Sequence, residues 1–102
     1  MSIKLIYLAE AENDLREIVQ YHIRAAGIRS ARSVYQTMRG EICRLRDFHH
    51  SGQVHPDPEL AALGYRKLVL TRTYVAIYKV IEDNVYIYRI INGRTDYPKL
   101  LK

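Results

Sequence analysis

Cysteine, tryptophan, proline and glycine are all scarce in this sequence, whose 102 residues include one cysteine, no tryptophan, three prolines and five glycines. With Cys43 alone, no disulfide forms within the chain, which suits a reducing cytosol. No apolar run is long enough to span a bilayer, and the N-terminus lacks a signal-peptide pattern. We therefore expect a cytoplasmic protein with no membrane partner, folded as a single domain over residues 1–102.

Acidic residues are also in deficit, since 11 aspartates and glutamates stand against 16 lysines and arginines, a net charge of +5. Such a surplus of positive charge is compatible with binding to nucleic acid, to an anionic surface or to an acidic protein, and charge alone does not discriminate among these partners. The nine tyrosines are the more unusual feature. Tyrosine is enriched where a surface is half-buried or meets a partner, so we expect partner contacts.

A short first strand at residues 3–7 precedes two helices joined by a very short link. From Ala9 onward, apolar residues recur every three or four positions, which predicts a helix that Gly27 ends. A second helix is predicted to begin at Arg29 or Ser30, with an apolar stripe that reaches Phe48. Helices joined by two or three residues run antiparallel, so we predict a helical hairpin.

Strands fill the C-terminal half of the chain. The prolines within residues 49–64 exclude a helix interior and predict a loop, with a short turn at Glu59–Leu63. Three strands with hairpin-length connections are then predicted at Tyr65–Thr71, Tyr74–Ile81 and Val85–Asn92. The order β-α-α-β-β-β indicates an α+β fold with the helical hairpin packed on one face of a small antiparallel sheet.

The last two predicted strands carry apolar residues on both faces. The final strand is expected to alternate between one face with Val85, Ile87, Arg89 and Ile91 and another with Tyr86, Tyr88 and Ile90. A sheet covered on one side alternates more cleanly, so the second face is covered by the tail Thr95–Lys102 or by another molecule. We favour a docking surface for another protein; a central strand buried on both sides is the alternative.

Metal and cofactor sites are not expected. His49, His50, His55 and Cys43 match no zinc-finger spacing, and Cys43 is expected to be buried in its helix as a small hydrophobe. The sequence has no glycine-rich phosphate loop, no nucleophile elbow and no plausible Ser/His/Asp set.

Four segments, in this order, resemble the ParE/RelE superfamily of toxins from bacterial type II toxin–antitoxin systems. Ala9–Ile18 has the family's acidic helix start followed by Asp-Leu-Arg-Glu-Ile, and Gly64–Leu68 has its Gly-x-Arg. Tyr74–Val80 resembles the family's following strand, and Val85–Tyr97 resembles its last strand with a Gly-Arg-x-Asp ending. The resemblance covers nearly the whole chain. One departure is Leu8-Ala9 at the helix start, where the family often has a polar cap and proline.

The superfamily divides by mechanism. RelE-type members are ribosome-dependent mRNA endoribonucleases, a chemistry that needs a base, an acid and cations. When the chain is aligned with that pattern, Arg66 retains one of the cationic positions. The other catalytic positions correspond to Leu68, Val75, Thr95 and Leu101. This loss favours the ParE branch and a chain that is not an enzyme. A shift of one or two residues would bring in Lys67, Arg72 or Arg94, so the RelE-like nuclease stays as one alternative and an inactive binding module of the same fold as another.

The resemblance implies a ParE-like inhibitor of DNA gyrase that arrests growth and stabilises plasmids. It also implies a ParD-like antitoxin whose acidic segment folds on the toxin in a hetero-oligomer. The arginines of the second helix suit that segment, and we do not expect direct nucleic-acid binding; an ordinary solvated face is the simplest alternative. Candidate contacts with target or antitoxin are Arg66, Arg72, Arg89, Arg94, Asp96 and Tyr97. Arg94 and Asp96 have an alternative role as a structural pair.

Overall fold

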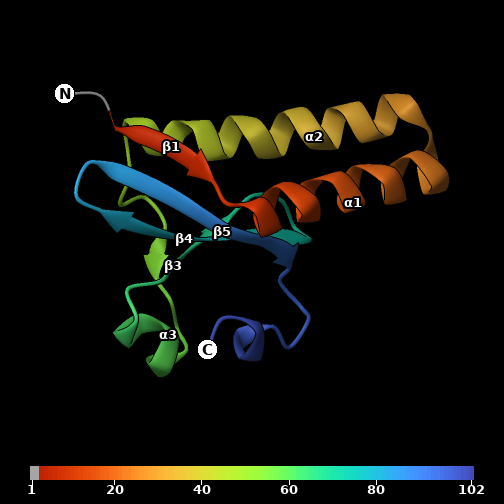
Figure 1. The fold of residues 1–102 in the computed structure, drawn as a ribbon. Coiled ribbons are helices and arrows are strands. Elements are labelled where there is room, and N and C mark those ends of the chain that lie inside the picture. Colours follow the sequence, from red (N-terminus) through yellow and green to blue (C-terminus); the bar gives the residue numbers. More distant parts are fainter. Residues whose placement is uncertain (1–2) are drawn as a thin grey trace.

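A five-stranded sheet forms the middle layer of the molecule, with a helical hairpin on one face and a short helix and the C-terminal segment on the other (Figure 1). The computed structural model describes residues 3–102. The elements are β1 (Lys4–Tyr7), α1 (Ala9–Ala26), α2 (Ile28–Cys43), η1 (Arg44–Arg46), β2 (Gln53–Val54), α3 (Pro58–Ala62), β3 (Arg66–Val69), β4 (Tyr74–Ile81), β5 (Asn84–Asn92) and η2 (Pro98–Leu100). The α+β class and the hairpin packed on the sheet are confirmed.

The sheet is mixed, whereas a purely antiparallel sheet was predicted. Its order is β1-β5-β4-β3-β2, and the edge strand β1 runs parallel to β5. Parallel neighbours need a long crossover connection, and here everything between Tyr7 and Asn84 provides it. Neighbours so distant in sequence leave no local signal of their pairing.

The helical hairpin turns on a single residue. Gly27 has a φ of 91°, in the left-handed region that favours glycine, so one residue reverses the chain between α1 and α2. The predicted stripe of α2 buries Ala31, Met38 and Ile42, but the α-helix ends at Cys43. Two predictions for this helix are therefore wrong. Phe48 lies after the end of the helix and has 59% of its surface exposed, and Cys43 is exposed rather than buried.

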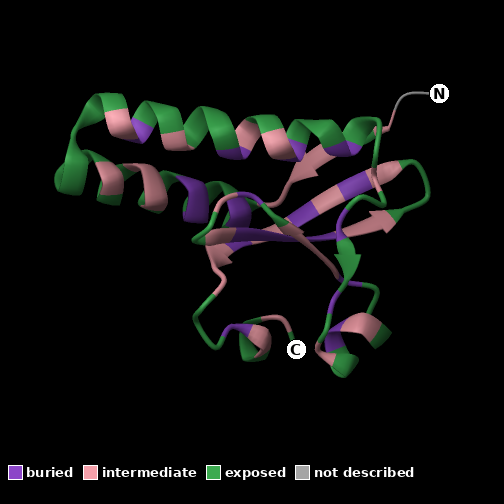
Figure 2. Ribbon diagram, turned by 180° about the vertical axis from the view of Figure 1, so that it is seen from behind, coloured by how far each residue is buried: buried purple, intermediate pink, exposed green. Residues whose placement is uncertain are grey.

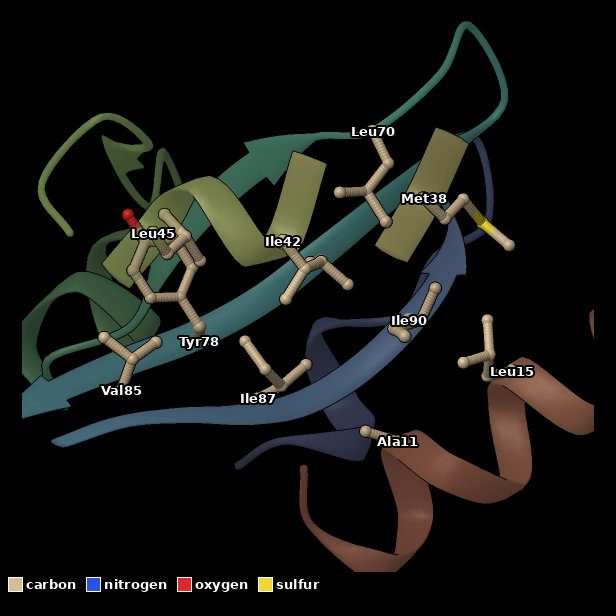
Figure 3. Close-up of a cluster of buried hydrophobic side chains, with 11 residues drawn as sticks. Ala11, Leu15, Met38, Ile42, Leu45, Leu70, Tyr78, Val85, Ile87 and Ile90 are labelled. Atoms are coloured by element: carbon tan, nitrogen blue, oxygen red, sulfur yellow. The ribbon is translucent and has the colours of Figure 1, made fainter. Parts of the chain in front are cut away.

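The main hydrophobic core lies between the hairpin and the sheet. Figure 3 shows Leu15 from α1 and Ile42 from α2 reaching toward Ile87 and Ile90 on β5. Tyr78 on β4 is fully buried beside them, with its ring in this core. Farther from the sheet, the outer side and the turn of the hairpin are exposed (Figure 2).

A second, smaller core fills the opposite face of the sheet. It combines Val75 and Ile77 of β4 with Leu60 of α3, Tyr65 and Tyr97. Because the chain's own α3 and C-terminal segment cover these strands, the preference for a docking surface on this face is wrong. The alternative, coverage by the chain's own tail, describes the structure.

A β-bulge on β5 changes which residues face each core. Tyr78 pairs with Ile87 and Ile77 pairs with Arg89, so Tyr88 is an extra residue between two pairs. An extra residue inverts the alternation beyond it. Ile90 therefore belongs to the first core, whereas Ile91 packs on the second, against the alternation predicted for this strand.

Candidate functional site

A groove of about 520 Å³ runs along the surface where α1 and α2 meet, and it is lined by residues of both helices. Its lining is mainly apolar and consists of Leu15, Val19, Ile23, Ile28, Ala31 and Tyr35, with Glu12, Arg16, Gln20 and Arg32 among them. Ile23 and Ile28 have 41% and 65% of their surface exposed. Exposed aliphatic side chains that gather in one concave strip are typical of a surface that binds another protein.

Positive charge borders this groove. Arg16 and Arg32 lie in its wall against one acid, Glu12, and that carboxylate is 3.8 Å from the Arg39 guanidinium on α2. Arg16 donates a hydrogen bond only to the neutral Asn13 side chain, over 3.3 Å, and forms no ion pair within residues 3–102. The groove therefore suits an amphipathic segment with acidic flanks.

Arg89, a predicted contact residue, joins β5 to α1 through an internal ion pair. Its Nε and Nη2 donate to the two carboxylate oxygens of Asp14 over 2.7 and 3.0 Å. The same carboxylate accepts the backbone N–H of Ile90 at 3.0 Å. These hydrogen bonds to Asp14 raise the pKa of Arg89 above its ordinary value. Sequence reasoning missed Asp14, which had no distinguishing signal apart from its place in a helix start rich in acids.

Arg66 is also turned inward, toward the loop before β2. Its Nη2 donates to the carbonyl oxygens of His50, over 3.0 Å, and of Gly52. Its Nε is buried and has no hydrogen-bond partner among residues 3–102. Tyr78 holds the same loop, since its hydroxyl donates to the His49 carbonyl at 3.0 Å and accepts the Gly52 N–H at 3.1 Å. Arg66 thus has a structural role in the fold.

The remaining predicted contacts separate into one buried and three exposed residues. Tyr97 is 5% exposed, and its hydroxyl lies 2.7 Å from Nε2 of His55. Arg72, Arg94 and Asp96 are exposed, and Arg94 and Asp96 form no ion pair with each other within residues 3–102. The structure does not bring the predicted residues together as one site.

The residues that align with the catalytic positions of RelE-type nucleases lie on different faces of the sheet. Leu68 packs against the core under the hairpin, whereas Val75 and Leu101 belong to the opposite core. Thr95 is exposed, and its hydroxyl donates to the Asn92 carbonyl over 2.7 Å. Because Leu68 lies on the other face of the sheet from Val75 and Leu101, the four side chains do not converge on one point.

The histidine and cysteine residues do not assemble a metal centre. Across residues 3–102, no group of three or more His, Cys, Asp or Glu side chains is placed to hold a metal ion. The rings of His49 and His50 lie 4.3 Å apart between centroids and are tilted by 55°, and the His55 ring is hydrogen-bonded to the Tyr97 hydroxyl. Within the same residues, no helix is both long and apolar enough to cross a membrane.

The architecture is that of a solved toxin–antitoxin structure. The chain superposes on a chain of the chromosomal ParDE TA system from P. aeruginosa with a TM-score of 0.75 and 22% identity, covering 88% of this chain and 95% of that one. At that identity the likeness establishes the fold. Residues 5–97 match the family model of the ParE toxin of type II toxin-antitoxin systems, parDE. The chain therefore belongs to the ParE toxin family. A comparison with curated proteins gives no match.

Proposed function

We propose that this ParE-family toxin arrests growth by inhibiting DNA gyrase in the cytoplasm, and that a cognate ParD-like antitoxin neutralises it by lying in the α1–α2 groove. Inhibition without nuclease chemistry is supported by the residues found at the positions that are catalytic in RelE-type nucleases. Leu68, Val75 and Leu101 are apolar and serve in two hydrophobic cores on opposite faces of the sheet.

RNA cleavage at a 2′-hydroxyl would need a base, an acid and several cations converging on one phosphate. Of the cations expected on that pattern, Arg66 is the one retained, and its Nη2 is engaged with two loop carbonyl groups. A protein that acts by binding its target needs no such convergence. This difference favours the binding mechanism.

The groove supports the antitoxin proposal through its shape and charge. An amphipathic helix presents apolar side chains at i, i+3, i+4 and i+7, which suit the half-buried Val19 and the exposed Ile23, Ile28 and Tyr35 of the groove. Acids on the flanks of that helix would face Arg16 and Arg32. The same acids would repel nucleic acid from this surface, so one segment would cover and neutralise it.

Gyrase supercoiling of a relaxed plasmid tests the target. We expect the purified chain to reduce supercoiling in a dose-dependent way, and its cognate antitoxin to restore it. The control is relaxation by a type I topoisomerase, which should not respond. A folded, growth-arresting sample without effect on gyrase would contradict the proposal, and cleavage of translated mRNA would then favour the nuclease alternative.

The groove is tested by a pair of charge substitutions, Ile23→Glu and Ile28→Glu. Two carboxylates in the apolar strip would be desolvated and would repel an acidic partner, so we expect affinity for the cognate antitoxin to fall at least about a hundredfold. Isothermal titration calorimetry measures this change. The matched control is Ile81→Glu, because Ile81 is 46% exposed at the end of β4, outside the groove. Equal affinities of the two variants and the parent chain would refute this binding mode.

A further inference from the structure

The C-terminal segment Tyr97–Lys102, here named the strap, covers the second face of the sheet. Tyr97 is buried in that core and Leu101 packs against it. Figure 1 shows the strap beside α3, below the sheet and on the side opposite the hairpin. The segment is short and has only one turn of 3₁₀-helix, Pro98–Leu100, so its position depends on the contacts at its ends.

His55 makes the first of these end contacts. Its Nδ1 accepts the backbone N–H of Asp57 over 3.0 Å, and its Nε2 lies 2.7 Å from the Tyr97 hydroxyl. Because Nδ1 accepts, the proton of the neutral ring belongs on Nε2, which then donates to Tyr97. The ring is 4% exposed. The geometry therefore selects one tautomer of the neutral imidazole.

Lys102 makes the second end contact with the same short segment. Its Nζ lies 3.5 Å from Asp57 Oδ2 and 3.3 Å from Glu59 Oε2. Asp57 also caps α3, since its Oδ1 accepts the backbone N–H groups of Glu59 and Leu60 over 2.9 and 3.2 Å. Both ends of the strap are thus held by residues 55–59, and a change at His55 reaches the strap and the start of α3 together.

The strap covers a basic and aromatic surface. The Lys79 ammonium lies over the rings of Tyr65 and Tyr88, 4.3 and 5.2 Å from their centroids. A cavity of about 370 Å³ separates these tyrosines from Leu100, Leu101 and Lys102. Detachment of the strap would open this partly open cavity further and uncover Tyr65, Tyr88 and the lysine that lies over their rings.

We propose that His55 is a proton-operated latch, in which protonation of its ring releases the strap and uncovers the Tyr65–Lys79–Tyr88 surface. A proton added at Nδ1 would point at the N–H of Asp57, so two donors would oppose each other and the contact would break. The loop carrying His55 would then shift away from both Tyr97 and the α3 cap. This device does not depend on the identity of the toxin's target.

Acid is expected to open the latch because the closed state disfavours the charged ring. Burial and the nearby Lys67 on β3 lower the pKa of His55, whereas Asp57, itself paired with Lys102, opposes the shift. The contribution of the neutral His55 ring to the stability of the closed state is fully present above the ordinary histidine pKa of about 6.5. It is lost as pH falls from there through the lowered pKa of the closed state. The opening equilibrium should rise by up to about tenfold per pH unit in this window.

Hydrogen exchange of the strap amides, measured by mass spectrometry from about pH 8 to about pH 5 and corrected for intrinsic exchange, tests the latch. We expect protection of the strap to fall with acid while that of α2 stays constant. The His55→Gln variant keeps an N–H donor toward Tyr97 but does not titrate, so its strap profile should be flat. Tyr97→Phe should lower strap protection even at the alkaline end.

The matched control is His22→Gln, which alters another His–Tyr contact, 3.2 Å between His22 Nε2 and the Tyr74 hydroxyl, away from the strap. Its strap profile should follow the parent chain. If His55→Gln does not fold, NMR titration of the parent chain replaces it, and the His55 ring and the strap amides should report one shared pKa. A pH-independent strap, or an acid response that persists in His55→Gln, would overturn the proposal.

Discussion

Asp14→Ala is expected to lower the free energy of unfolding by about 3–5 kcal/mol, because it leaves a buried charge without its partner. Asp14 is 8% exposed and accepts from the Arg89 guanidinium twice and from the Ile90 N–H once. After the substitution, Glu10 remains as the nearest acid to Arg89, and its carboxylate is 3.5 Å away on a largely exposed side chain. Urea unfolding followed by circular dichroism measures the change.

Two further variants separate the ion pair from general damage to the helix. Glu41→Ala removes the acid of an exposed pair, 3.6 Å from Arg44, and should cost less than about 1 kcal/mol. The double variant Asp14→Ala with Arg89→Leu should recover part of the loss, because an apolar pair replaces the unpaired charge. If Asp14→Ala costs no more than Glu41→Ala, the anchor role of Asp14 is wrong.

Gly52→Ala is expected to destabilise the protein by about 3 kcal/mol, through steric overlap and lost hydrogen bonds. A Cβ at this position would lie 2.7 Å from the Lys67 carbonyl oxygen and 2.7 Å from the Tyr78 hydroxyl. Neither can yield easily, since one is sheet backbone and the other is the end of a fully buried ring. The loop must therefore move, which disrupts its bonds to Tyr78 and Arg66.

Gly40→Ala provides a control with the opposite sign. Gly40 lies within α2, and a Cβ there would meet nothing within 4 Å. Because alanine is the better helix former, this variant should gain about 0.5–1 kcal/mol. Thermal unfolding of both variants measures the pair. Similar midpoints for Gly52→Ala and the parent chain would contradict the packing described around Tyr78.

The groove was only partly predictable from the sequence. The basic face of α2, including Arg32, was identified from helical periodicity. The concave strip with Val19, Ile23 and Ile28 was not, because it depends on how closely α1 and α2 pack and on how far they extend past the sheet. Those distances come from tertiary contacts, which a one-dimensional pattern does not contain.

By itself the sequence determined the elements whose causes are local: the two long helices, the end of the first helix at Gly27, and the strands of the β3–β4–β5 meander. Periodicity, turn residues and short connections act over a few positions, so they can be read in one dimension. Tertiary structure alone decided the parallel pairing of β1, the bulge at Tyr88, and the covering of the second face by the strap. It also brought Arg89 into an ion pair with Asp14 and the Tyr97 hydroxyl into hydrogen-bond contact with His55. These outcomes depend on which distant groups can satisfy a buried charge or hydrogen bond, and only the folded chain brings those groups together.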